Sequence, residues 1–190
     1  MKQSETVQPC YCLCETPYGP VVILWSIHEG RPHILRILIS MDRVTARQRL
    51  EVLFPDSAPS SCGEIDCIMD GITAFLNGED ITFSLDVARM DLCSPFQEKV
   101  LRAEHGIPHG RIATYQGIAR HIGNTRSARA VGSSLAGNPF PIIIPCHRAV
   151  RSEGTLGGYQ GGLKMKRSLL EMEGISFNES GCVITKEFFY

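Results

Sequence analysis

A thiol and an imidazole stand next to each other in the segment "NPFPIIIPCHRAV", at residues 138–150. Cys146 and His147 follow directly after Pro145, which ends an apolar run. Only the thiolate form of cysteine attacks efficiently, and a nearby imidazole can take the thiol proton. Adjacent side chains diverge in a regular strand, so we expect a turn or helix start after Pro145 to bring both to one cavity, where a water can join them. Glu173 in "LLEMEGI" is a candidate third member, because a carboxylate can hold an imidazole in one tautomer.

A glycine-rich segment follows the Cys–His pair. "GTLGGYQGGLK" places five glycines between residues 154 and 162. Such a loop can wrap closely around a flat ligand, and Tyr159 can form an aromatic wall. The segment does not match the G-x-x-x-x-G-K-[ST] phosphate-binding pattern. An isolated Cys–His pair is more often structural than catalytic, but this loop favours a binding site beside the thiol.

The elements that must position these residues begin with a strong helix start. Ser94 can cap the helix, Pro95 suits its first position, and Gln97 can complete a capping box. Two short helical patterns follow, "TYQGIARHIG" and "SARAVGSSLAGN", joined by "NTR". Their size and spacing predict a helix-turn-helix.

The second of these helices has one apolar face and one face of small residues. Ala128, Val131 and Leu135 share a face that can anchor in the core. Such a small face lets the backbone approach closely, as entry to a DNA minor groove requires, and its only long side chain, Arg129, can reach the base stack. A tightly packed helix pair with an exposed arginine is the alternative, and the pattern alone does not decide. The residues of the small face are Arg129, Ala130, Ser133, Ala136 and Gly137.

Composition and charge suggest a soluble globular protein of one or two domains. The chain has 190 residues, of which 43% are hydrophobic and 21% charged. Residues 1–91 hold seven Lys and Arg against thirteen Asp and Glu, whereas residues 92–175 hold eleven against five. We therefore place a boundary near residue 91, between a scaffold domain (1–91) and a second domain (92–190). Only the second has the charge expected for binding a phosphate backbone.

The sequence shows no sign of a membrane or secretory segment. It lacks an apolar run of about 18 residues, and its start lacks the features of a signal peptide. We expect an intracellular protein, in the cytoplasm or, in a eukaryote, the nucleus, and no contact with membranes. Its eight cysteines should then be reduced thiols.

The first 91 residues predict an α+β arrangement. "CYCLCETP", "VVILWSI" and "HILRILIS" read as strands, helices are expected over about 43–53 and over 64–78, and "ITFSLD" reads as a closing strand. Cys10, Cys12 and Cys14 alternate and would share one strand face. They could bind a metal with His28 or His33, but buried packing is the commoner outcome and we assign no metal site.

The second part of the chain resembles the methylated-DNA–protein-cysteine methyltransferases, or O6-alkylguanine-DNA alkyltransferases. The resemblance covers residues 94–174 and lies in "SPFQEKVLRAEHGIPHGRIATYQGIA", "ARAVGSSLAGNP", "PCHRAV" and "GTLGGYQGGLKMKRSLLEMEG". The first 91 residues fit the family's amino-terminal domain in size and strand order. The resemblance implies a ribonuclease-H-like sheet-and-helix domain there and a mostly helical domain with the helix-turn-helix after it.

The activity implied by the resemblance is direct, irreversible repair of duplex DNA. The alkyl group moves from O6-alkylguanine, or less well from O4-alkylthymine, to Cys146, once per molecule and without a cofactor. His147 is implied to act on Cys146 through a water, and Glu173 to orient His147. Asn138 is implied to brace the turn before the active site, and Tyr115 to donate to guanine N3 as the base leaves.

The resemblance also implies how the base is held. Arg129 corresponds to the family's arginine finger, which fills the gap in the stack after the nucleotide flips out. Tyr159 is implied to line the guanine pocket, where backbone groups of Cys146, Ala149 and Gln160 read the base edge. The predicted pocket consists of Tyr115, Leu135, Ala149, Tyr159, Gln160 and Lys166.

Two positions depart from the family pattern. Ala149 stands where many relatives carry valine, and Gln160 where a small residue is common, so we expect an altered pocket size. A non-catalytic branch has tryptophan in place of the cysteine, and Cys146 favours the transferase branch. We expect a monomer with no obligate protein partner, whose partner is double-stranded DNA carrying alkylated guanine. The alternatives are a cysteine hydrolase and a DNA-binding protein that senses alkyl damage without repairing it.

Overall fold

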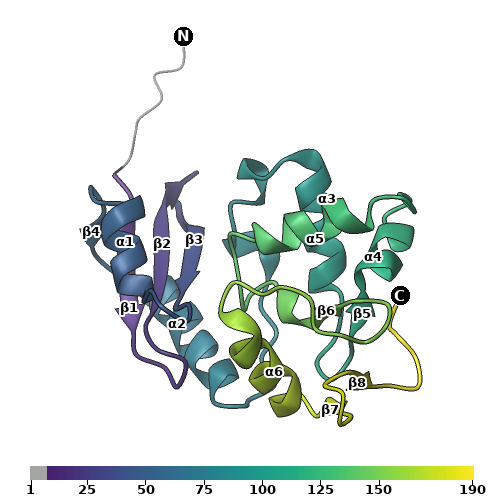
Figure 1. Ribbon diagram of the computed structural model, residues 1–190. Coiled ribbons are helices and arrows are strands. Elements are labelled where there is room, and N and C mark those ends of the chain that lie inside the picture. Colours follow the sequence, from purple (N-terminus) through teal and green to yellow (C-terminus); the bar gives the residue numbers. More distant parts are fainter. Residues whose placement is uncertain (1–7) are drawn as a thin grey trace.

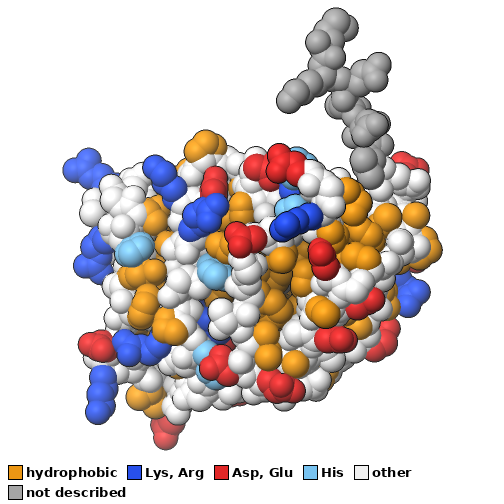
Figure 2. All heavy atoms as spheres, turned by 180° about the vertical axis from the view of Figure 1, so that it is seen from behind, with side chains coloured by type: hydrophobic (Ala, Val, Ile, Leu, Met, Phe, Trp, Pro, Cys, Tyr) orange, Lys and Arg blue, Asp and Glu red, His pale blue; other side chains and the backbone are white. Residues whose placement is uncertain are grey.

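The computed structural model describes residues 8–190, so part of the segment used to exclude a signal peptide lies outside it. A four-stranded sheet with two helices forms the amino-terminal half, and a mostly helical half lies beside it (Figure 1). The fold is α+β, as predicted. The charge difference between the halves is visible on one face, where Lys and Arg gather over the carboxy-terminal half (Figure 2).

The sheet has the strand order β3-β2-β1-β4. Its strands are β1 (Cys10–Cys14), β2 (Val21–His28), β3 (Arg31–Ile39) and β4 (Ala58–Pro59). The first three form an antiparallel meander and β4 runs parallel to β1. Glu29 and Gly30 make the tight β2–β3 turn with φ values of 50° and 79°, the positive angles that a two-residue hairpin loop favours. The three long strands predicted from the sequence are confirmed.

Strand β2 is buried on both faces, which explains its unbroken apolar run. Val22 and Leu24 pack under α1 (Ala46–Leu53), whereas Val21, Ile23 and Trp25 belong to the main core with α2 (Gly63–Leu76). Helix α1 begins three residues later than predicted. Thr45 forms a complete capping box with Gln48, which fixes the start of the helix there.

The predicted strand over "ITFSLD" is wrong. The alternating apolar side chains Ile81, Phe83 and Leu85 pack against the main core, but their backbone pairs with no strand of the described chain. The Ser84 hydroxyl accepts a hydrogen bond from the Asp86 backbone and starts a single 3₁₀ turn instead, Leu85–Val87. The alternating pattern correctly indicates which side chains face the core, but a strand also needs an adjacent strand to pair with.

The two halves share one hydrophobic core, which runs from the sheet into the helices of the second half. The outer edge of β3 is hydrogen-bonded to segments from further along the chain. Ile37 donates its backbone N–H to the Pro139 carbonyl at 2.8 Å, and Arg89 donates to the Ile34 carbonyl at 3.0 Å. The sheet edge therefore supports the segment that leads to Cys146.

The second half opens with a short 3₁₀ turn, Met90–Leu92, and α3 (Pro95–His105), capped by Ser94 as predicted. The Gln97 side chain does not complete a capping box, which corrects the prediction. Its amide donates instead to the carbonyls of Ser134 and Gly137 at 3.2 and 3.1 Å. Gln97 therefore ties α3 to the end of the helix that was predicted to carry Arg129.

The remaining elements surround the Cys–His segment. Helices α4 (Tyr115–His121), α5 (Ala128–Ala136) and α6 (Gly162–Met172) form, and short parallel strands β5 (Ala113–Thr114) and β6 (Ala149–Val150) pair beside them. An antiparallel pair, β7 (Ser176–Phe177) and β8 (Val183–Ile184), closes the chain.

All eight cysteines are free thiols. Cys10, Cys12 and Cys14 are half-buried and pack against the main core, and Cys14 lies 3.6 Å from the Thr73 hydroxyl of α2. Within residues 8–190, no group of three or more His, Cys, Asp or Glu side chains could hold a metal. No helix in that range is long and apolar enough to cross a membrane.

Candidate active site

Cys146 begins a single 3₁₀ turn, Cys146–Arg148, directly after Pro145. The break in regular backbone expected after the proline is therefore present. Just before it, Ile142 has a φ of 75°, a left-handed conformation that a β-branched residue rarely adopts. Such strain persists only where the surroundings hold it, which marks this loop as a fixed part of the structure.

Asn138 holds the loop in this shape. Its amide donates to the Ile144 carbonyl at 3.0 Å and to the Cys146 sulfur at 3.2 Å, while its side-chain oxygen accepts from the Phe140 backbone at 2.9 Å. A second amide reinforces the arrangement, because Gln160 donates to the Asn138 carbonyl at 2.7 Å. One buried side chain thus fixes both the backbone before the thiol and the direction of the thiol.

His147 lies beside the thiol in sequence and is completely buried. Its Nε2 is 2.8 Å from Glu173 Oε1, and its Nδ1 is buried with no hydrogen-bond partner among the described residues. Since the ionised carboxylate can only accept, Nε2 carries the proton and Nδ1 has a free lone pair. Burial lowers the pKa of His147, while Glu173 opposes that effect. The neutral ring can serve as a base.

Arg148 makes the strongest contacts to Glu173. Its Nε lies 2.9 Å from Oε2, its Nη2 lies 2.9 Å from Oε1, and its Nη1 donates to the Ile107 carbonyl at 2.6 Å. Burial pushes the pKa of Glu173 upward, but the hydrogen bonds and charges of His147 and Arg148 outweigh it and bring the pKa to about 2. Glu173 is therefore a permanent anion between two buried partners.

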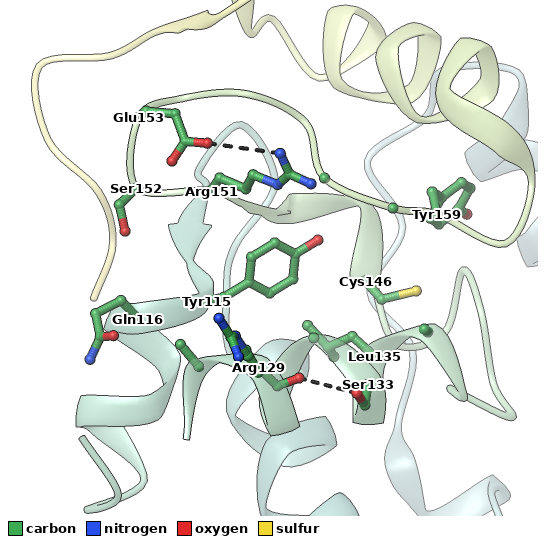
Figure 3. Close-up of a pocket in the computed structure, with 15 residues that line it drawn as sticks. Tyr115, Gln116, Arg129, Ser133, Leu135, Cys146, Arg151, Ser152, Glu153 and Tyr159 are labelled. Carbon is green, nitrogen blue, oxygen red and sulfur yellow. Dashed lines mark hydrogen bonds and ion pairs between the residues drawn. The ribbon is translucent and has the colours of Figure 1, made fainter. Parts of the chain in front are cut away.

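The Cys146 thiol opens into a cavity of about 590 Å³, called here the Cys146 cavity. Cys146 itself is only 4% exposed. Burial raises the pKa of its thiol to about 12, against the opposing effects of the Asn138 hydrogen bond and the Lys166 charge. The thiol is therefore protonated until something takes its proton. The side chains that shape the cavity include Tyr115, Arg129, Leu135, Cys146, Arg151 and Tyr159 (Figure 3).

Lys166 is buried behind the cavity and organises its wall. Its ammonium donates to the carbonyls of Ala149, Leu156 and Gly158, and lies 3.4 Å from the Tyr115 hydroxyl. Burial lowers the pKa of Lys166 to about 8, although the nearby Cys146 and Glu104 oppose this. The ammonium thus joins the glycine-rich segment to strand β6 and to Tyr115.

The predicted residues fall into three places. Tyr115, Leu135 and Tyr159 line the Cys146 cavity. Ala149, Gln160 and Lys166 are not among the residues that line it, which corrects their placement in the predicted pocket: the Gln160 amide and the Lys166 ammonium donate to backbone carbonyls instead. Asn138, His147 and Glu173 are buried, and Asn138 contacts the thiol. Contrary to expectation, His147 is not among the residues that line the cavity with Cys146, because its ring is packed against Glu173. On α5, Val131 and Leu135 are buried as predicted. The small face is exposed throughout, and its residues are Arg129, Ala130, Ser133, Ala136 and Gly137.

Sequence reasoning missed three charged residues. In the sequence, Arg148 stands out only as a letter of "PCHRAV", although its position directly after His147 is a signal. Glu104 is completely buried in α3, and its carboxylate has no hydrogen-bond partner among the described residues. Nothing in the helical pattern marked it. Arg151 lines the Cys146 cavity, and its place shortly before the glycine-rich segment could have drawn attention to it.

Comparisons with known proteins show which family the chain resembles. A family model described as "6-O-methylguanine DNA methyltransferase, DNA binding domain" matches residues 95–175. The methylated-DNA–protein-cysteine methyltransferase of Methanothermobacter thermautotrophicus is 44% identical over 121 residues, which are 64% of this chain and 66% of that protein. The Mycobacterium tuberculosis protein of the same name is 40% identical over 164 residues, covering 86% of this chain and 91% of that one. The crystal structure of Mycobacterium tuberculosis OGT in complex with DNA is similar, with a TM-score of 0.64 and 30% identity over 86% of this chain and 92% of that one.

Proposed function

The chain belongs to the methylated-DNA–protein-cysteine methyltransferase family, and we propose that Cys146 is the residue that accepts the alkyl group. The protein acts as a DNA-repair methyltransferase that removes the alkyl group by direct transfer. The substrate is double-stranded DNA carrying O6-alkylguanine, with O4-alkylthymine a weaker one. No cofactor takes part. The observation that carries the proposal is a thiol that opens into a cavity while a buried His147–Glu173 pair stands beside it.

The proton leaves the thiol through His147. The free lone pair on His147 Nδ1 takes it through a bridging water, and the Glu173 anion stabilises the charged ring. The sulfur then bonds to the alkyl carbon as the bond between that carbon and O6 breaks. The guanine leaves with one proton gained from the Tyr115 side or from water, and His147 returns the thiol proton to water, so no net proton is gained or lost. Tyr115 lines the same cavity and donates to the departing base, which lowers the barrier as negative charge develops there. The thioether product has no labile bond, so each molecule acts once.

The target nucleotide has to leave the base stack, because O6 lies inside the duplex. Flipping costs a few kcal/mol, which contacts made by the protein offset. Helices α4 and α5 act as a helix-turn-helix whose small exposed face enters the minor groove, and Arg129 fills the gap left in the stack. The cavity that Arg129 borders leads to Cys146, so the flipped base enters from the α5 side.

The amino-terminal half serves as a scaffold. The proposed division assigns residues 1–91 to it, and its ribonuclease-H-like sheet supports residues 92–190 through the edge of β3 and the shared core. The protein works as a monomer within the cell, since transfer needs only one cavity and one thiol.

Intact-mass measurement tests the proposal. After mixing with a duplex that contains O6-methylguanine, the protein should gain one methyl group, located on Cys146, and then stop. Cys146→Ser should bind the duplex without gaining mass. Continued turnover on an ester or peptide would instead establish a hydrolase, and duplex binding by the unaltered protein with no added mass would establish a damage sensor.

Arg129 has a separate test. Arg129→Ala should slow methyl transfer from the duplex far more than it slows reaction with free O6-benzylguanine, because the free base needs no flipping. Equal slowing of the two reactions would contradict the stacking role.

A further inference from the structure

Two arginines border the Cys146 cavity, and the proposed function uses only one of them. Arg129 comes from α5, whereas Arg151 follows β6 and lies on the opposite side of Tyr115 (Figure 3). The Arg151 side chain is 61% exposed, so its guanidinium is open to solvent at the cavity mouth. The cavity therefore carries positive charge on both sides of the path to Cys146.

Glu153 is the acidic residue among those that line this cavity, and it lies close to Arg151. The two form a long ion pair, with 4.0 Å between Arg151 Nη1 and Glu153 Oε1, and Glu153 is 60% exposed. The Thr155 hydroxyl donates to the same Glu153 oxygen at 2.9 Å. Glu153 is thus held in place by Thr155, while Arg151 is bound to it only loosely.

The turn that carries this pair is well anchored. The Arg151 N–H donates to the Thr155 carbonyl and the Gly154 N–H to the Arg151 carbonyl, each at 2.9 Å. The Val183 N–H of β8 donates to the Gly154 carbonyl, also at 2.9 Å. With its backbone fixed at both ends, the guanidinium is the part of Arg151 that can change partner.

We propose that Arg151 binds a phosphate of the DNA strand that delivers the flipped nucleotide, and that Glu153 is the anion which this phosphate replaces. A flipped nucleotide carries a phosphate on either side of its sugar, and those groups stay at the cavity mouth while the base moves inward. A guanidinium binds phosphate through two parallel hydrogen bonds, a better match than one 4.0 Å contact to a carboxylate. Glu153 competes with an arriving phosphate for the same guanidinium, so it weakens DNA binding until Arg151 has exchanged partners.

The inference rests on the proposed function and extends its DNA contacts beyond α5. It predicts that loss of Arg151 slows the duplex reaction and that loss of the Glu153 charge speeds it. A general effect of surface charge would produce changes of similar size at an exposed Arg–Glu pair elsewhere on the protein. Arg167 and Glu171 on α6 provide the matched control. They form an exposed Arg–Glu pair at 2.8 Å and do not line the cavity.

The experiment measures second-order rates of alkyl transfer from a duplex containing O6-methylguanine and from free O6-benzylguanine, between 50 and 200 mM salt. Arg151→Ala should slow the duplex reaction about tenfold, at least about five times more than the free-base reaction. It should also reduce by about one the slope of log rate against log salt, as expected for one lost phosphate contact. Glu153→Gln should speed the duplex reaction several-fold at low salt, and Arg151→Ala should abolish that gain in the double variant.

The control variants Arg167→Ala and Glu171→Gln should change the duplex rate less than about twofold. Equal slowing of both substrates by Arg151→Ala, or a gain from Glu153→Gln that persists without Arg151, would overturn the inference. If the unaltered protein transfers methyl groups normally but Arg151→Ala matches Arg167→Ala, the inference fails and the proposed function stands. If the unaltered protein transfers none, both fail.

Discussion

Glu104 should lower the stability of the protein at neutral pH, because its carboxyl group is buried in the second half without a paired cation in the described chain. It is completely buried in α3, and neither oxygen has a hydrogen-bond partner among residues 8–190. Burial raises the pKa of Glu104 from 4.5 to about 8, against the opposing charges of Lys166 and Arg148. The folded protein therefore holds Glu104 as a neutral acid at pH 7, whereas the unfolded chain exposes it as a carboxylate.

This difference in protonation sets both the sign and the size of the effect. Between pH 4.5 and 8 the unfolded state binds fewer protons than the folded state at this residue, so stability falls as the pH rises. Each pH unit in that range costs about 1.4 kcal/mol. Glu104 therefore lowers the free energy of unfolding by about 3 kcal/mol at pH 7, relative to its contribution below pH 4.5.

Glu104→Gln removes the titration and keeps the size of the side chain. In urea denaturation, the variant should match the unaltered protein within about 1 kcal/mol at pH 5 and exceed it by about 3 kcal/mol at pH 7. Glu98→Gln is the control, because Glu98 lies on the same helix, is partly exposed and pairs with Arg102. Its difference from the unaltered protein should stay small and constant, since such helix pairs contribute about 0.2–0.5 kcal/mol. A Glu104→Gln difference that is the same at pH 5 and pH 7 would refute the reasoning.

Two further substitutions test the architecture around the thiol. Gly157 has a φ of 66°, and a Cβ there would lie 2.6 Å from the Tyr115 hydroxyl, so Gly157→Ala should slow reaction with O6-benzylguanine at least about tenfold by strain and displacement. Gly158→Ala, whose Cβ would meet no atom within 4 Å, should change it little, and equal rates for both variants would contradict the contact. Arg148→Met should lower the free energy of unfolding by about 3–5 kcal/mol in urea denaturation, because it removes the cation paired with the buried Glu173 anion and leaves it the neutral His147 and the Gly110 N–H. A loss under about 1 kcal/mol, typical of exposed pairs, would show that Glu173 does not depend on Arg148.

Local patterns predicted most of the fold, because its helices and long strands are set by short-range signals. Serine and threonine caps and apolar periods lie within a few residues of the elements they define, as Ser94 does for α3. The two failures needed information from elsewhere in the chain. Whether residues 81–86 form a strand depends on an available neighbour, and whether Gln97 turns back to cap its own helix depends on the carbonyls of Ser134 and Gly137, which lie about forty residues away.

The residues of the site likewise divide into those that local sequence signals predict and those that depend on distant parts of the chain. Cys146, His147 and Glu173 are predicted from residue type and position, and the structure pairs His147 with Glu173 directly after Cys146 in one turn. Arg148 could not be predicted as a buried residue because arginine is usually exposed. Its burial is explained by the contact with Glu173, which lies 25 residues later in the sequence. Glu104 could not be predicted at all, since an acid within a helical pattern reads as surface.

Arg148, which the sequence did not mark, affects which group can hold the thiol proton, because it pairs with Glu173. Arg148 holds Glu173 so firmly as an anion that the carboxylate does not take a proton from His147 near neutral pH. Burial keeps His147 neutral before the reaction, and the same anion stabilises its ring once it is charged. In the proposed mechanism, the proton from Cys146 therefore stays on the imidazole while the new sulfur–carbon bond forms. The orienting role that the sequence suggests for Glu173 therefore gains a physical basis from Arg148, the cation that keeps this carboxylate ionised beside a neutral His147.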